Sequence, residues 1–528
     1  MKKKVYQILE KYIDEKIILE KPKDAKFGHF ATPIAFSLAK KLRKSPMIIA
    51  DELVNKIIDE PNFKEVTAIK GFVNIKLSSE FLDEYSSYAL KNENKFGKSD
   101  KNKKILLEYV SANPTGPLHI GHARGAILGD TLYQIARHLG YEITSEYYIN
   151  DAGNQIEMLG NSVFLVGQEE ILNLSPQFPD EFYRGEYIKD LASKTAQKFG
   201  ETIFEDKKNI EKISNFAKDE MLELIKSNLQ LVNIEFDGFV SEKEMFKKWD
   251  DSLTKLEKNS AVYTKDNKLW LKSSECGDEK DRVVVRDNGQ PTYLAGDVIY
   301  HDDKFKRNYD QYINIWGADH HGYIARVKSA IKFLGYDESQ LEVILSQMVS
   351  LLKDGEPYKM SKRAGNFILM SDVVDEVGSD ALRFIFLTKK SDTHLDFDIE
   401  MLKKEDSSNP VYYINYAHAR INQVIAKSGK NIESLSDVKF SSLDESAENL
   451  LFNALLLPEV LEDVFNQKAP QKLADYLKTL AGSLHKFYNS HKVIGADNED
   501  ELLKLLATVA VSIRVGLKLI GIQAKYKM

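Results

Sequence analysis

The chain has 528 residues, of which 43% are hydrophobic and 29% charged, and this composition indicates a folded globular protein of about three domains. Its single cysteine, Cys276, excludes a disulfide framework and a cysteine-rich zinc site, and it fits a reducing cytoplasm. The net charge of −7 argues against a generic polyanion binder, and no membrane span is expected because charged side chains at Lys504, Arg514 and Lys518 interrupt the apolar stretch 502–522.

The charge is unevenly distributed along the chain. Residues 1–104 hold 22 Lys and Arg against 15 Asp and Glu, so this segment carries +7 and the remainder −14. A basic module on an acidic body suits contact with a nucleic acid at defined places. A lysine-rich surface that is merely solvated has the same count, so charge alone leaves both interpretations open.

Residues 1–98 mix helical and strand patterns, which predicts a small α+β domain. Amphipathic periodicity predicts helices at 34–42 and 48–58, and alternating apolar residues predict a strand at 71–77. The polar stretch 91–104 then reads as a connector to the next domain.

The stretch that follows combines a buried strand, a loop and a helix. The apolar run at 105–110 predicts the strand, prolines and glycines punctuate the loop, and Gly140 ends the helix. His119 and His122 lie where the loop becomes the helix, where backbone N–H groups and the helix dipole also favour an anion. The two histidines could simply cap the helix, but a pair that flanks Ile-Gly at such a turn favours a phosphate site.

Residues 105–400 alternate predicted strands and helices, which is typical of a doubly wound parallel sheet. The stretch 161–231 is mostly helical and is expected to be an insertion between the two halves of this fold. Asn150-Asp151 is expected to cap the helix after the second strand. The further strands are predicted at 142–149, 282–286, 312–316 and 341–348.

Two polar loops in this region are candidate ligand sites, because ligands bind such sheets beyond the carboxyl ends of the strands. In the loop and helix start at 291–297, Tyr293 and Asp297 lie one helical turn apart on one face. In the loop 317–322, His320 belongs to an Asp-His-His run that resembles a metal site. We expect no protein-bound metal there, because no third ligand cluster of matching type is apparent.

The loop 353–366 is cationic and contains Lys359, Ser361 and Lys362. Placed over a triphosphate, such a mobile loop would neutralise charge in the transition state. By itself it is only a basic surface turn, and its pairing with the histidine loop some 240 residues upstream makes it specific.

Residues 401–528 predict an all-α domain, with helices at 450–464, 472–488 and 499–522. Near its start, four side chains could stack on and hydrogen-bond unpaired bases, although most aromatics at helical spacing are core residues. These are Tyr413, Tyr416, His418 and Arg420.

Two short motifs carry a resemblance to a known family. His-Ile-Gly-His at 119–122 and Lys-Met-Ser-Lys at 359–362 are similar to the HIGH and KMSK signatures of the class I aminoacyl-tRNA synthetases. The flanking sequence SANPTGPLHIGHARGAILGD resembles the version found in arginyl-tRNA synthetases, as do KPKDAKFGHFAT at 21–32 and Asp-Ala-Leu-Arg at 380–383. In that family KMSK is often degenerate, whereas here it is complete.

The resemblance implies an α/β multidomain architecture. It comprises a Rossmann-like catalytic domain at 105–400, an α+β N-terminal domain at 1–98 near the tRNA elbow, and a helical DALR-type anticodon-binding domain at 401–528. The implied protein is a cytoplasmic monomer that does not bind membranes. The insertion is too short and too helical for an editing domain.

The implied reaction has two steps. ATP and L-arginine form arginyl-adenylate and pyrophosphate, and the arginyl group then passes to the 3′ end of tRNA(Arg). His119 and His122 would hold the phosphates, Lys359 and Lys362 would stabilise the leaving pyrophosphate, and Mg²⁺ would bridge the phosphates. The residues expected to bind ATP are Pro114, Thr115, Gly116, His119, Gly121, His122, Lys359, Met360, Ser361 and Lys362.

The resemblance also implies an arginine pocket. A guanidinium is permanently charged and presents its donors in a fixed fork, so it needs carboxylates. Asp297 and Tyr293 match the guanidinium-binding pair of the family, and Glu242 matches another acidic position. The full expected set is Asn113, His122, Glu242, Tyr293, Asp297 and His320.

Other hypotheses fit the sequence less well. The cysteinyl relatives need a cysteine-rich zinc site, and the glutamyl and glutaminyl relatives lack an N-terminal domain of this kind. A synthetase-like RNA-binding protein that has lost catalysis is disfavoured because both signatures are intact. A nucleotidyltransferase that shares the histidine loop would leave the two flanking domains without a purpose.

Overall fold

The structure, a computed structural model, describes residues 1–358 and 367–528. The chain divides into two compact units. The larger comprises Asp100–Lys404 and Lys468–Gln471, and the other comprises Met1–Ser99, Glu405–Gln467 and Lys472–Met528. Most residues of the predicted N-terminal and C-terminal domains therefore belong to the same compact unit. The assignment of three functional domains stays a prediction.

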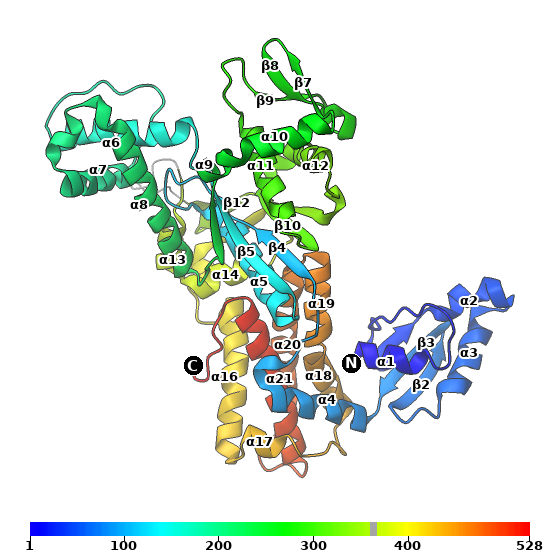
Figure 1. Cartoon of the computed structure of the whole chain (residues 1–528). Helices are drawn as coiled ribbons and strands as arrows, with labels where there is room; N and C mark the ends of the chain where they lie inside the picture. Colours follow the sequence, from blue (N-terminus) through cyan, green and yellow to red (C-terminus); the bar gives the residue numbers. More distant parts are fainter. Residues whose placement is uncertain (359–366) are drawn as a thin grey trace. The chain divides into compact units, whose positions relative to one another are not determined.

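The larger unit is built on a parallel sheet of five strands in the order β11–β10–β4–β5–β6 (Figure 1). From β4 the chain adds β5 and β6 on one side and later returns to add β10 and β11 on the other. The winding thus reverses between β4 and β10, and in doubly wound folds ligands bind at the carboxyl ends of such a strand pair. The strands are β4 (Lys104–Glu108), β5 (Glu142–Ile149), β6 (Gly238–Ser241), β10 (Gln311–Gly317) and β11 (Leu341–Ser346).

This sheet confirms the predicted doubly wound fold, but one predicted strand lies elsewhere. The strand predicted at 282–286 pairs antiparallel in a separate sheet of order β7–β8–β9. Asp266 and Asn267 connect its first two strands with φ of +53° and +56°, as in two-residue hairpin turns, and this hairpin supplies the third strand with a partner. The polar loop after that strand is therefore not at the carboxyl end of a strand of the parallel sheet. The three strands are β7 (Val262–Lys265), β8 (Lys268–Leu271) and β9 (Arg282–Val285).

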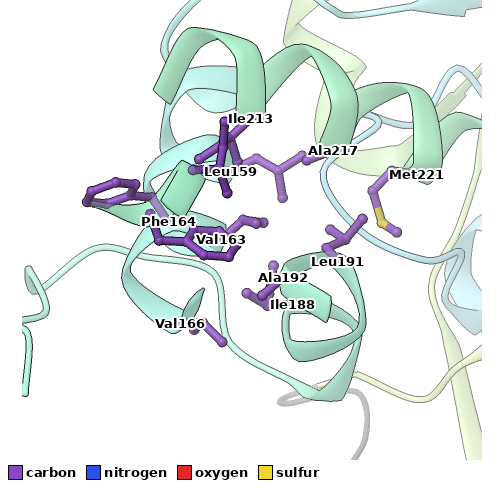
Figure 2. Close-up of a cluster of buried hydrophobic side chains, with 12 residues drawn as sticks. Leu159, Val163, Phe164, Val166, Ile188, Leu191, Ala192, Ile213, Ala217 and Met221 are labelled. Atoms are coloured by element: carbon purple, nitrogen blue, oxygen red, sulfur yellow. The ribbon is translucent and has the colours of Figure 1, made fainter. Parts of the chain in front are cut away.

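The predicted helical stretch between β5 and β6 forms three main helices, α6 (Asn154–Glu170), α7 (Glu186–Phe199) and α8 (Ile210–Leu231). Each has an apolar stripe, and Figure 2 shows these side chains gathered between the helices. This stretch thus has a hydrophobic core of its own. Its buried members include Leu159, Val163, Phe164, Ile188, Leu191, Ile213, Ala217 and Met221. Two short turns, η3 (Glu201–Phe204) and η4 (Lys207–Asn209), precede the last helix.

The predicted cap of the first of these helices is wrong. The N-cap of α6 is Gly153, three residues beyond Asn150, and the Asp151 carboxylate points to another element. It accepts hydrogen bonds from the Ser241 hydroxyl at 2.8 Å and from the Lys243 N–H at 3.0 Å, at the start of α9 (Glu242–Met245). Asp151 therefore caps a helix that is distant in sequence, which a local pattern cannot reveal.

The remaining elements of the larger unit surround the sheet. Helix α5 (Ile120–His138) joins β4 to β5, and α12 (Ile324–Phe333) joins β10 to β11. The others are η5 (Phe246–Lys248), α10 (Trp249–Lys258), η6 (Ser273–Cys276), α11 (Tyr293–Lys306), η7 (Ala318–Tyr323), η8 (Glu338–Gln340), β12 (Val349–Lys353), β13 (Glu356–Pro357), α13 (Met370–Val377), α14 (Ser379–Phe386), β14 (Leu395–Asp398) and α15 (Ile399–Leu402).

The other unit joins a small antiparallel sheet and two neighbouring helices to a helical bundle. Its N-terminal elements are α1 (Lys2–Leu9), η1 (Ala25–Phe27), β1 (Phe30–Thr32), α2 (Ile34–Leu42), α3 (Pro46–Ile57), β2 (Phe63–Ile69), β3 (Phe72–Leu77), α4 (Ser79–Asn92) and η2 (Glu93–Lys95). Its C-terminal helices are α16 (Pro410–Ser428), α17 (Ile432–Leu435), α18 (Glu445–Leu455), α19 (Leu457–Gln467), α20 (Gln471–Ser490) and α21 (Glu499–Leu519).

Helix α21 shows why lysine occurs in an otherwise apolar stretch. The fully buried Lys504 donates to Asp83 Oδ1 of α4 at 2.6 Å and to the Val438 carbonyl at 2.5 Å. The buried hydroxyls of Ser86 and Thr508 also hydrogen-bond between α4 and α21 at 2.6 Å. These contacts join the N-terminal segment to the bundle. None of the helices that the structure describes is long and apolar enough to cross a bilayer.

Helix α5 lies very close to the strand that precedes it. An ideal Cβ on Gly129 would lie 2.3 Å from Cγ of the fully buried Tyr109, which directly follows β4. Only glycine allows this approach, although glycine in mid-helix costs roughly 0.5–1 kcal/mol relative to alanine. The position of α5 on the sheet therefore depends on Gly129.

We predict that Gly129→Ala destabilises the larger unit. The added methyl group would force apart α5 and β4, and overpacking of this kind costs about 1–3 kcal/mol. The measurement is thermal unfolding of the full chain, with a fall of several degrees expected. Gly125→Ala on the same helix is the matched control, because nothing lies within 4 Å of its Cβ position. A Gly129→Ala protein as stable as the Gly125→Ala protein would contradict the prediction.

Candidate functional site

The loop after β4 begins with a strained turn. Val110 has a φ of +67° and Ser111 a φ of +42°, and a β-branched residue rarely adopts such a conformation. The Ser111 hydroxyl donates to Glu108 Oε1 at 2.9 Å and accepts from the Tyr148 N–H at 3.1 Å. Strain of this kind persists where the surrounding structure fixes it, often at active sites. Contacts to β4 and β5 thus fix the direction in which the loop leaves the strand.

The two signature histidines contact each other at the start of α5. His119 Nδ1 accepts from the Gly121 N–H at 3.1 Å, and the His119 N–H donates to His122 Nδ1 at 3.4 Å. Their rings stack with centroids 3.6 Å apart. Burial lowers the pKa of His119, and burial together with the neighbouring His119 lowers the pKa of His122 to about 3.

Both imidazoles are therefore neutral near pH 7, with their tautomers set by these bonds. Since Nδ1 is an acceptor in both rings, each proton is on Nε2. The pair can offer two neutral N–H donors to a ligand at the positive end of the α5 dipole. Such donors can follow negative charge that develops on a phosphate without repelling a cationic substrate.

The chain that follows the second signature pairs with the histidine loop. The Ile120 N–H donates to the Ile368 carbonyl at 2.9 Å, and the Met370 N–H donates to the Leu118 carbonyl at 3.0 Å. The Phe367 ring stacks on His119, with centroids 5.4 Å apart. Lys359, Met360, Ser361 and Lys362 lie outside the described residues, but the segment that leaves them is adjacent to His119.

The middle of the histidine loop is covered by the helical insertion. Pro114 and Thr115 are buried, and the Thr115 N–H donates to the Asn113 carbonyl at 2.8 Å. An ideal Cβ on Gly116 would lie 3.5 Å from the Tyr187 hydroxyl of α7. The loop is thus held from the insertion side, whereas Gly121 at its end is exposed.

Asn113 connects this loop to a second site. Its side-chain Nδ2 donates to Gln155 Oε1 of α6 at 2.6 Å. The residues just before Gln155 line a cavity of about 540 Å³ that Glu242 and Tyr293 also line. Tyr293 is half exposed at the start of α11. The histidine loop and this cavity therefore share the start of α6.

Two acidic side chains lie close to each other beside the cavity. Asp297 Oδ2 accepts from the Tyr323 hydroxyl at 2.7 Å, and Glu242 is buried beside it. An ideal Cβ on Gly296 would lie 2.4 Å from Glu242 Oε1, so glycine lets this carboxyl group approach α11. Burial raises the pKa of both carboxyls to about 7, and Asp297 further raises that of Glu242. Such a pocket selects a buried cation.

The lining of the cavity is partly aromatic and carries a positive charge. Phe246, Trp249 and Arg286 belong to it. His320 lies nearer Tyr323, with ring centroids 6.4 Å apart, and its side chain is 58% exposed. The structure thus brings Glu242, Tyr293 and Asp297 together and places His320 next to the tyrosine that bonds Asp297.

Helix α11 is anchored to the parallel sheet by buried ion pairs. Lys304 Nζ donates to Glu108 Oε2 at 2.5 Å and to Asn314 Oδ1 at 3.0 Å. Arg307, at the end of α11, donates to both carboxylate oxygens of Glu146 on β5 at 2.6 and 2.9 Å. Strands β4, β5 and β10 thereby hold the helix that begins with Tyr293.

Three residues that contact the predicted site residues were not singled out from the sequence. These are Tyr323, Gln155 and Phe367. Each contacts a predicted site residue, but the partner lies 26 to 248 residues away along the chain. A tyrosine within the polar Gly-Ala-Asp-His-His-Gly-Tyr run was the only local signal.

The Asp-His-His run that resembles a metal site lies in η7, at the surface. The carboxylate of Asp319 lies 3.6 Å from His320 Nε2, and both side chains are exposed. Over the described part of the chain, no three His, Cys, Asp or Glu side chains are arranged to hold a metal ion.

Three family models match the chain. They are described as the arginyl tRNA synthetase N terminal domain at residues 1–77, the catalytic domain of tRNA synthetases class I (R) at 86–427, and the DALR anticodon binding domain at 414–528. An arginine–tRNA ligase from a Nitratiruptor species is 63% identical over 528 residues, which is the full length of both chains. The chain belongs to the arginyl-tRNA synthetases of class I.

Solved structures agree with this assignment. An arginyl-tRNA synthetase structure from Campylobacter jejuni is 57% identical, with a TM-score of 0.83, and covers 86% of this chain and 100% of its own. The Thermus thermophilus arginyl-tRNA synthetase is 20% identical with a TM-score of 0.78, and each chain is covered fully, which shows the shared fold.

The Asp-Ala-Leu-Arg run of this synthetase belongs to the larger unit. It lies on α14, before the matched DALR domain begins. Its Arg383 is fully buried and forms an ion pair with Asp130 of α5. On the other side of that helix, the buried Arg124 donates to the Gln347 and Lys390 carbonyls at 2.9 Å each. Both arginines therefore hold the histidine-bearing helix in place.

We predict that Lys304→Met weakens both stability and catalysis. Removing the cation leaves Glu108 charged and buried, which typically costs about 3–5 kcal/mol. Thermal unfolding should shift down by several degrees, and kcat/KM should fall for arginine and for ATP together, because the pair joins α11 to the strand before the histidine loop. Lys194→Met removes an exposed partner of Glu220 and should change neither quantity appreciably. If Lys304→Met changed the unfolding temperature and kcat/KM no more than Lys194→Met does, Lys304 would not anchor α11.

Proposed function

We propose that this synthetase joins L-arginine to tRNA(Arg) with ATP, releasing AMP and pyrophosphate. The observation that carries the proposal is the buried acidic pair Asp297–Glu242 with its raised pKa values, of which Glu242 lines the cavity that shares the start of α6 with the neutral histidine loop. A permanently charged guanidinium fits such a pocket, and a triphosphate fits the helix N-terminus beside it. The sequence identity of 63% over the full length to an arginine–tRNA ligase supports the same reaction.

In the first step an arginine carboxylate oxygen attacks the α-phosphorus of ATP. A bond from phosphorus to the arginine carboxylate forms, the bond to the bridging oxygen breaks, and pyrophosphate leaves. No enzyme nucleophile is needed, so the protein contributes positioning and charge stabilisation. His119 and His122 donate from Nε2 to phosphate oxygens, and we assign pyrophosphate stabilisation to Lys359 and Lys362.

In the second step a terminal ribose hydroxyl of the tRNA attacks the arginyl carbonyl. The ester bond forms, the bond between the carbonyl carbon and the phosphate oxygen breaks, and the hydroxyl proton passes to a phosphate oxygen of AMP as it leaves. Mg²⁺ would enter bound to ATP and would neutralise charge on the phosphates. The nucleotide-contacting set further includes Pro114, Thr115, Gly116, Gly121, Met360 and Ser361.

For arginine, we assign the guanidinium to Asp297, Glu242 and Tyr293. Asn113 holds the backbone of the amino acid together with His122, and His320 contributes from the rim. The single, partly exposed free Cys276 supports action in a reducing cytoplasm. We propose that the chain acts as a monomer, with the N-terminal segment near the tRNA elbow and the helical bundle at the anticodon.

Charging of total tRNA with each standard amino acid tests the reaction. We expect attachment of arginine only, and Asp297→Asn should raise the arginine KM at least tenfold, since a hydrogen-bonded charge is worth about 1.5–3 kcal/mol. The ATP KM should change little. Asp219→Asn, at an exposed position of α8, controls for the loss of one negative charge. Charging with another amino acid would refute the pocket, and no charging at all would favour the non-catalytic RNA-binding alternative.

We also predict that arginine binding weakens as the pH falls through 7. The carboxyls of Asp297 and Glu242 have pKa values raised to about 7 in the empty pocket, so below pH 7 they are protonated and must release protons to accept a cation. The arginine KM should therefore rise between pH 8 and pH 6, by up to about tenfold per unit below the pKa for each proton released.

Calorimetry in buffers of different ionisation enthalpy measures this proton release directly. We expect net release at pH 7 and much less at pH 8.5. The same raised pKa values mean that ionisation of these groups opposes folding, so the arginine-free protein should lose stability as the pH rises from about 4 to 7. A pH-independent affinity for arginine over this range would remove both carboxyls from the site.

A further inference from the structure

Tyr323 lies between the acidic pocket and a cluster of aromatic and cationic side chains. It is the last residue of η7, which follows β10 at the reversal point of the sheet. Its ring lies edge-on to Trp316 and His320, with centroids 6.4 Å away in each case. The guanidinium carbon of Arg326 lies 5.1 Å from the ring centroid. The ring is therefore held on several sides and has one preferred position.

The hydroxyl of Tyr323 reaches from this position to Asp297. It donates to Oδ2 at 2.7 Å, a short bond of the kind made to a charged acceptor. The neighbouring Glu242 has one buried carboxylate oxygen, Oε2, that lacks a hydrogen-bond partner within the described residues. Bonds from Tyr148 and from the Ala152 backbone lower the pKa of this glutamate against the larger, opposite effect of burial. Asp297 is thus the pocket carboxyl on which Tyr323 acts.

Other charged groups around Asp297 act in opposite directions. Glu108 on β4 disfavours its ionised form, while Lys304 on α11 favours it, and Asp297 in turn disfavours the ionised form of Glu242 on α9. Tyr148 on β5 also faces it, but as a neutral phenol. Burial opposes ionisation most strongly. The bond from Tyr323 opposes this effect, because a donor to a carboxylate stabilises the charged form.

Tyr323 remains a donor throughout the working pH range. Burial and the nearby Asp297 carboxylate raise the pKa of its phenol well above the usual value. Arg326 reinforces the arrangement, because a cation over an aromatic ring holds the ring in place. Arg326 is in turn held near Asp278, with Nε 3.7 Å from Oδ2, and Asp278 accepts two hydrogen bonds from Arg282 at 2.7 Å.

We propose that Tyr323 is a positioning residue for arginine, whose hydroxyl favours the ionised form of Asp297 and fixes the direction of its carboxylate. The inference rests on the proposed arginine activity and adds a specific role for one side chain. Because Oδ2 is engaged by Tyr323, Oδ1 is the oxygen left to receive a guanidinium.

Tyr323→Phe tests this role, since it deletes the hydroxyl and keeps the ring in its contacts. We expect the arginine KM to rise about tenfold near pH 7, because a hydrogen bond to a charged group is lost. The effect should shrink to about threefold or less at pH 8.5, where Asp297 ionises without help. The midpoint of the KM profile should accordingly move to higher pH, while the ATP KM and the melting temperature stay close to those of the wild type.

Tyr336→Phe is the matched control. This tyrosine also donates to an aspartate of α11, Asp302 Oδ1 at 2.8 Å, but Asp302 is paired with Lys255 and Lys306. The control removes an equivalent phenol–carboxylate bond and should leave the arginine profile unchanged. A KM increase in Tyr323→Phe that is equal at all pH values would show a merely structural role and overturn the proposal.

A double-mutant cycle separates this proposal from the proposed function. If Tyr323 acts through Asp297, then Tyr323→Phe should have little further effect on the arginine KM in the Asp297→Asn protein. Additive effects would show that Tyr323 acts independently and would overturn the proposal. Failure of the wild-type protein to charge arginine would refute the proposed function instead, so the two failures are distinguishable.

Discussion

The buried ion pair between Lys304 and Glu108 joins the two halves of the catalytic site. Glu108 ends β4, immediately before the strained turn that leads to the histidines, and Lys304 lies on the helix that begins with Tyr293. Two buried charges are costly unless their remaining hydrogen-bonding capacity is satisfied. Here Ser111 and Asn314 satisfy it, which also fixes the loop and β10 relative to the pair.

This pair does more for geometry than for stability. A hydrophobic pair of similar volume would hold α11 against the sheet equally well, but it would tolerate small rotations of the helix. A lysine bonded to a glutamate and an asparagine has few alternative arrangements. Adenylate formation requires reacting atoms to be aligned within a few tenths of an ångström, so a directional anchor suits a helix that presents the guanidinium site.

Much of the site could be predicted from the sequence, because its parts are local. The strand, loop and helix around His119 and His122 follow from periodicity and turn residues, and the spacing of Tyr293 and Asp297 indicates one helix face. Pairings between distant segments could not be predicted this way. The strand before Tyr293 joined an antiparallel sheet because a hairpin precedes it, and Asp151 caps α9 instead of α6.

The Asp-Ala-Leu-Arg run illustrates the same limit. The motif is readable in the sequence, and the resemblance connects it with anticodon binding. Its arginine nevertheless forms a buried ion pair with Asp130, which lies 253 residues away on the histidine-bearing helix. A short motif therefore identified the family, whereas only the fold shows which helix Arg383 supports.

The acidic pocket, if it binds arginine as we propose, would make a rigid site selective for that amino acid. Two carboxyl groups that are buried beside each other repel when ionised, and their protonated forms cannot bind a guanidinium well. A cation of the right shape relieves the repulsion and receives their hydrogen bonds at the same time, so binding energy comes partly from removing an unfavourable arrangement. Lysine carries the charge but lacks the planar fork, and a neutral analogue has the shape but not the charge. Each would leave part of the arrangement uncompensated, and this double requirement is what distinguishes arginine.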